Sequence, residues 1–99
     1  MDIQFQLKVI GEAWDTVDDN IDVQIDIDDG RVFSATFFTL QNIETLFRKN
    51  AQTGECASGL YFWASEMILV KDLKMETIHR AVKDLILNNE LQNASLRIR

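Results

Sequence analysis

The feature that most constrains the fold is a strict alternation of apolar and polar residues over residues 21–28. Isoleucine or valine occupies every odd position, and Asp22, Gln24, Asp26 and Asp28 occupy the even ones. A period of two puts the apolar side chains on one face of a strand and the acids on the other. The pattern therefore predicts an antiparallel sheet with one covered face and one solvated face.

The next apolar segment, residues 31–38, predicts a hairpin with this strand in one of two registers. A two-residue turn sets Ile25 beside a serine and mixes apolar with polar faces. A three-residue loop over residues 28–30 sets Ile25 beside Phe33 and keeps the apolar faces together, which is the usual determinant of register. It also gives Gly30 the left-handed position that such a loop needs. We predict the three-residue loop.

The other elements follow from the same periodicities. We expect a strand over 3–9 and a helix over 40–51, capped by Thr39 and with an inward apolar stripe that starts at Leu40. An apolar strand over 60–70 should follow, bent or split at Ser65-Glu66. A helix over 75–88 and an optional short strand over 94–98 complete the chain. The prediction is one α+β domain over residues 1–99. It has a mainly antiparallel sheet of four to five strands with two helices packed on one face, in the order β-β-β-α-β-α with an optional final β.

Length and composition exclude several protein classes. Ninety-nine residues with 46% hydrophobic content fit one packed domain. No apolar run approaches the roughly 20 residues that span a bilayer, and the start lacks the basic and apolar regions of a secretory signal. The single cysteine, Cys56, agrees with a reducing compartment. We expect a cytoplasmic protein.

The net charge of −6 is unevenly distributed along the chain. Residues 1–30 hold nine acids against one lysine, which gives −8, and residues 31–99 hold seven acids against nine bases, which gives +2. The acidic third opposes binding to nucleic acid and to anionic membranes. A basic protein is its natural partner.

Metal binding and catalysis find little support. Asp26, Asp28 and Gly30 superficially resemble a calcium loop, but the glycine falls one place early and the later bidentate acid is absent. Zinc has only Cys56 and His79 as soft ligands, and nothing around Cys56 supports a nucleophile pair with His79. No phosphate-binding glycine loop or nucleophile elbow is present. We expect no cofactor, no metal and no enzymatic activity.

The block Tyr61-Phe62-Trp63 is the other conspicuous feature. At strand spacing, Tyr61 and Trp63 share one face and Phe62 takes the opposite one. We expect a core strand here, and an exposed partner interface is the alternative. Trp14, which lies among the acids, is the better candidate for an apolar contact anchor.

Three segments of the last two-thirds of the chain carry a family resemblance. They are TFFTLQNI at residues 36–43, TGEC at 53–56 and GLYFWASEMILV at 59–70. This pattern resembles a group of short bacterial orphan proteins that are similar to immunity proteins of polymorphic or contact-dependent toxin systems. The chain departs from the pattern at Glu66, where aspartate is commoner, and at Lys74-Met75, where Ser-Pro often begins the second helix. The resemblance supplies no functional residues and does not cover the acidic hairpin well.

Together, charge and resemblance predict an immunity-type protein that neutralises a basic toxin domain, most simply a nuclease. The alternative is a homo-oligomeric structural or adaptor domain, and a homodimer is compatible with either. The predicted contact residues are one tryptophan and seven acids: Trp14, Asp15, Asp18, Asp19, Asp22, Asp26, Asp28 and Asp29.

Overall fold

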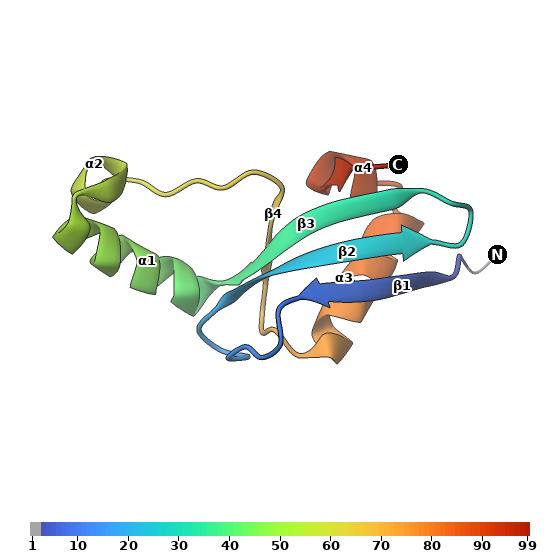
Figure 1. Cartoon of the computed structure of the whole chain (residues 1–99), viewed down its shortest axis with the longest axis horizontal. Coiled ribbons are helices and arrows are strands. Elements are labelled where there is room, and N and C mark those ends of the chain that lie inside the picture. Colours follow the sequence, from blue (N-terminus) through green and yellow to red (C-terminus); the bar gives the residue numbers. More distant parts are fainter. Residues whose placement is uncertain (1–2) are drawn as a thin grey trace.

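A computed structural model describes residues 3–99 and confirms the α+β fold (Figure 1). A five-stranded, mainly antiparallel sheet has the order β1-β2-β3-β4, and β5 also pairs with β3. The elements are β1 Phe5–Ile10, β2 Asn20–Ile27, β3 Val32–Thr39, α1 Leu40–Thr53, α2 Glu55–Gly59, β4 Met67–Val70, α3 Met75–Leu87, α4 Leu91–Ala94 and β5 Leu96–Arg97. None of the helices in residues 3–99 is both long and apolar enough to cross a bilayer.

Two strands share the second edge of β3. β1, β2 and β3 form an antiparallel meander. Along its first half β3 pairs with β5, antiparallel, and along its second half it pairs with β4, parallel. The parallel pairing follows from topology, since the chain passes through α1 and α2 before it returns to the sheet.

The β2–β3 hairpin has the predicted register and loop. Ile25 lies opposite Phe33, and the Ile27 N–H donates to the Arg31 carbonyl at 2.9 Å, which closes a three-residue loop. Gly30 has φ +98°, the left-handed conformation that the loop requires. The apolar faces therefore meet on one side of the sheet, and Asp22 and Asp26 lie on the open face.

The core lies between the other face of the sheet and the C-terminal helices. Val23, Ile25 and Phe37 are fully buried there against Ile78 and Val82 of α3, and Leu91 of α4 closes one end. Each such side chain contributes about 1.5–3 kcal/mol by leaving water. The helices that pack on this face are α3 and α4 (Figure 1).

Helix α1 begins as predicted but extends past the end of the sheet (Figure 1). The Thr39 hydroxyl accepts from the Asn42 N–H at 3.1 Å, which is the expected N-cap. Within the described residues, the buried core cluster and the side chains packed against it include no residue of α1. The predicted inward position of Leu40 is wrong, because 61% of its surface is exposed.

The chain bends at Glu66, where a bend or split was predicted, but only the second part of the predicted strand over residues 60–70 is a strand. Glu66 has φ +50°, which bends the chain, and only Met67–Val70 pairs with β3. Leu60 still has helical backbone angles, residues 61–64 belong to no helix or strand, and Ser65 lies in a turn, so this part of the chain lies outside the sheet. The expectation of a core strand is therefore wrong for Tyr61 and Trp63, which are 50% and 67% exposed because no second layer covers them.

Candidate protein-binding surface

The predicted contact acids do not form one cluster. They follow β2 from the loop before it, across the open face of the sheet, to the hairpin tip beyond it. Eight residues at about 3.3 Å each separate the two ends of β2 by roughly 25 Å. The surface therefore divides into an acidic end (residues 11–22), the open face around Asp26, and the tip at Asp28 and Asp29.

Carboxylates fix the backbone of the acidic end. Asp15 accepts from the N–H groups of Val17 at 2.7 Å and Asp18 at 3.1 Å, while Asp19 accepts from the N–H of Asp15 at 3.0 Å. The Val17 N–H, and then that of Asp18, hold the pKa of Asp15 below its ordinary value. The turn and the charge of Asp15 therefore stabilise each other.

Asp18 fastens this loop to helix α1. Its carboxylate accepts from Asn42 Nδ2 at 3.0 Å and from Thr45 Oγ1 at 2.8 Å. Asn20 Nδ2 donates to Asn42 Oδ1 at 2.9 Å, and Thr39 Oγ1 donates to the Val17 carbonyl. The sequence alone does not reveal these contacts, because they join residues more than twenty positions apart.

The open face keeps one acid exposed and pairs the other. Asp22 is exposed and accepts from Thr36 Oγ1 at 2.6 Å on the neighbouring strand. Asp26 is half-buried, accepts from Gln24 Nε2 at 2.8 Å and lies 3.0 Å from Lys8 Nζ. The Gln24 hydrogen bond, followed by that from Lys8, lowers the pKa of Asp26. Much of the negative charge of Asp26 is thus offset within the sheet.

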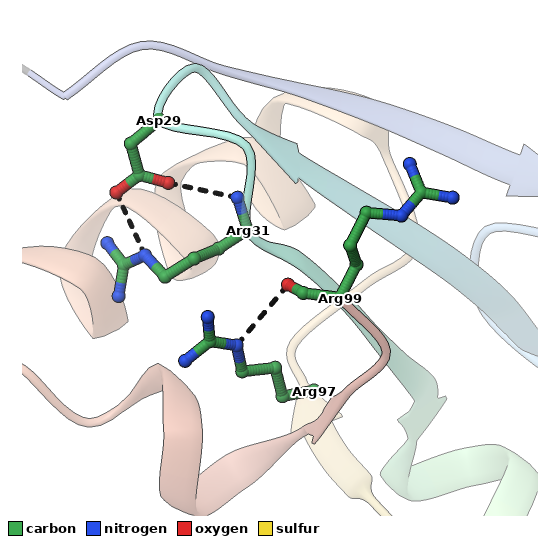
Figure 2. A network of polar contacts seen from close by, with 4 residues as sticks. All are labelled: Asp29, Arg31, Arg97 and Arg99. Atoms are coloured by element: carbon green, nitrogen blue, oxygen red, sulfur yellow. Dashed lines mark hydrogen bonds and ion pairs between the residues drawn. The ribbon is translucent and has the colours of Figure 1, made fainter.

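Arginine side chains partly neutralise the negative charge of the hairpin tip (Figure 2). Asp29 accepts from the Arg31 N–H at 3.0 Å and from Arg31 Nε at 2.9 Å, and the backbone bond is the larger cause of its lowered pKa. Arg97 and Arg99 of the C-terminal segment lie beside this pair. A charge count along β2 misses them, because the non-local pairing of β5 with β3 brings them here. Asp28 is exposed.

Trp14 has a packing role in this structure. Its indole Nε1 donates to the Leu73 carbonyl at 2.8 Å, and the ring is half-buried against the core. Part of the ring lines a shallow hollow with Lys74 and Met75. Trp14 therefore positions the acidic end and offers a limited apolar contact beside it.

Negative charge is concentrated at the acidic end. Residues 11–22 contain five acids and no base: Glu12, Asp15, Asp18, Asp19 and Asp22. Elsewhere on the predicted surface, Asp26 and Asp29 each have a basic partner. None of the five forms an ion pair within residues 3–99, although Lys74 lines the hollow beside Trp14 and Arg48 donates to Thr45 next to Asp18. This end of the sheet therefore holds a group of carboxylates that is free to attract a cation.

The candidate zinc ligands and nucleophile pair, Cys56 and His79, lie elsewhere. Cys56 is half-buried on α2, and His79 is exposed on α3, stacked on Phe5 with ring centroids 4.6 Å apart. Across residues 3–99, no group of three or more His, Cys, Asp or Glu side chains could hold a metal ion. Comparison of the chain with protein-family models, curated proteins and solved structures gives no significant match.

Proposed function

We propose that this chain is an immunity-type protein that binds and neutralises a basic toxin domain, through the acidic end. The observation that carries the proposal is the run of five acids without a base in residues 11–22, held in place by hydrogen bonds from the loop and from α1. A nuclease that binds phosphates presents a basic cleft, and a fixed anionic surface is complementary to it. The proposal places the protein in the cytoplasm, where such a toxin acts.

The geometry favours fast and specific association. Because the carboxylates of Asp15, Asp18 and Asp19 already accept hydrogen bonds, binding does not have to order the loop first. Their remaining lone pairs stay available to lysine and arginine. Concentrated charge of one sign also steers an oppositely charged partner and raises the association rate. We expect Glu12, Asp19 and Asp22 to make the charge contacts.

The test begins with the gene that neighbours the one encoding this chain. Where that gene encodes a secreted protein with a basic C-terminal domain, this domain is the probe, and a neighbouring gene without one would count against the proposal. Isothermal titration at several salt concentrations compares the native chain with the variant Glu12→Gln/Asp19→Asn/Asp22→Asn. Exposed ion pairs contribute about 0.2–1 kcal/mol each. Three lost pairs therefore weaken binding between about threefold and a hundredfold and flatten its salt dependence.

A matched control removes the same charge elsewhere. Glu76→Gln/Asp84→Asn/Glu90→Gln also changes the net charge by three, on α3 and at the N-cap of α4. It should leave affinity and salt slope close to those of the native chain. Equal effects of both variants would contradict a defined acidic site. Failure of the native chain to bind the probe, or to protect cells that express it, would contradict the proposed function.

A further inference from the structure

The second unusual region is a lobe formed by α1, α2 and residues 60–66, called the lobe below. In Figure 1 it projects from the end of the sheet where β3 ends. The chain measures 48 × 23 × 22 Å, and its radius of gyration is 14.5 Å. A compact domain of this length has a radius of gyration of about 13 Å. The lobe is therefore a projection that the core does not require.

The lobe has little apolar core of its own. The only buried residues of α1 are two asparagines, Asn42 and Asn50. Its apolar stripe, Ile43, Leu46 and Phe47, is only partly buried. A helix of fourteen residues is marginal in water unless its apolar face is covered, so complete burial of the stripe would stabilise the lobe.

Large apolar side chains are exposed on the same lobe. Leu40, Leu60, Tyr61 and Trp63 expose 61%, 79%, 50% and 67% of their surface. With about 200 Å² for each full side chain, they present on the order of 500 Å² of apolar surface. The partly buried α1 stripe adds to this area, and a standard stable interface buries roughly 800 Å² per partner.

The backbone of residues 61–65 also lacks partners. Among residues 3–99, no backbone hydrogen bond involves an N–H or C=O group of this segment, while the Glu66 carbonyl just after it accepts from Thr36 at 3.0 Å. A segment outside any sheet, with free backbone groups and exposed aromatic side chains, is a template for pairing with another chain.

The distribution of charge indicates which partner could cover the lobe. Residues 40–66 carry three acids and two bases, which gives −1, so the remaining residues carry −5 of the net −6. A cationic partner is drawn to the acidic end, whereas the lobe is close to neutral, so two copies of this acidic chain can meet there with little charge repulsion. We propose that the lobe is the interface of a symmetric homodimer, in which each copy covers the α1 stripe and the aromatic segment of the other. This inference does not depend on the proposed function, because it uses a different surface.

Sedimentation velocity of the full chain, from micromolar to near-millimolar concentration, tests the dimer. The native chain should reach twice the chain mass of 11.4 kDa. Leu60→Arg/Trp63→Arg should raise the dimer dissociation constant about thirtyfold or more, the loss expected for a central aromatic anchor. The control Leu87→Arg/Leu96→Arg changes two residues of similar exposure, 60% and 54%, outside the lobe and should leave the dimer intact.

A spectroscopic measurement guards against misfolding of the charged variant. In a Trp14→Phe background Trp63 is the only tryptophan, and its emission should shift to shorter wavelength as the dimer forms. A native chain that stays monomeric throughout, or a dimer that survives the lobe substitutions in a folded variant, would overturn the inference. So would an emission wavelength of Trp63 that is independent of concentration.

Discussion

Replacing Asp18 with alanine tests the link between the acidic end and the lobe. The carboxylate of Asp18 accepts from Asn42 Nδ2 at 3.0 Å and from Thr45 Oγ1 at 2.8 Å, and both donors belong to the first two turns of α1. Asp18→Ala removes both bonds and leaves two partly buried donors without this acceptor. We expect α1 to lose its main polar attachment to the loop.

The magnitude follows from the chemistry of the two bonds. A hydrogen bond to a charged group contributes about 1.5–3 kcal/mol when it is buried. Because Asp18 is only half-buried, water replaces part of each bond, and we expect a total loss of about 2–4 kcal/mol. For a domain of this size that corresponds to a fall of roughly 10–25 °C in the midpoint of thermal unfolding. Asp18→Asn should lose less, since its amide oxygen still accepts.

Urea unfolding followed by circular dichroism measures the loss, and amide hydrogen exchange locates it. Exchange in α1 should accelerate more than exchange in α3, because the bonds lie at the base of the lobe. Asp28→Ala serves as the control, since Asp28 is exposed at the hairpin tip, and its effect should stay within about 0.5 kcal/mol. If Asp18→Ala changed stability no more than this control, the proposed attachment of α1 would be refuted.

Three further outcomes are expected. Trp14→Phe, which loses the indole bond to the Leu73 carbonyl, should lower the free energy of unfolding by about 1 kcal/mol in the same urea assay. Gly59→Ala should lower the free energy of unfolding by about 2 kcal/mol or more, and the lobe should be destabilised first. The reason is that Gly59 has φ +82° and an added Cβ would lie 2.7 Å from the Phe47 carbonyl oxygen. The pKa of Asp15 is lowered from 3.8 in the folded chain, so its stabilising effect is complete above that value and is lost as pH falls through the lower folded pKa. Asp15→Asn should therefore flatten the dependence of stability on pH below about pH 4, and an unchanged slope would refute that role.

The local sequence pattern was enough to predict the hairpin, because apolar residues mark one of its faces and polar residues mark the other. The apolar residues must meet, and Gly30 fits one loop only, so the pairing of Ile25 with Phe33 follows from sequence. The apolar run also predicted a strand through Trp63, where the structure has none. It did not show that this residue is exposed, because the alternation of a strand does not tell whether a second layer covers it.

The environment of the acids was harder to predict from sequence, for a related reason. Asp18 bonds to a helix that follows more than twenty residues later, and the tip acid Asp29 lies beside Arg97, nearly seventy residues away. A count of charges along the chain cannot include partners that the tertiary fold brings together. The count therefore overestimated the negative charge of the tip. It also gave no sign of the hydrogen bonds that hold the acidic end in place.

These contacts change what the acids imply about function. Neighbouring aspartates repel each other. If these side chains made no stabilising interaction in the fold, that repulsion would favour a binding role. However, Asp15 and Asp19 accept hydrogen bonds from backbone N–H groups, and Asp22 accepts one from Thr36, so each side chain stabilises the fold. Asparagine or serine could cap the same turns without charge. What the structure leaves unexplained is therefore the charge rather than the hydrogen bonds, and exchange of aspartate for asparagine at Asp19 and Asp22 isolates that property while it keeps an acceptor in place.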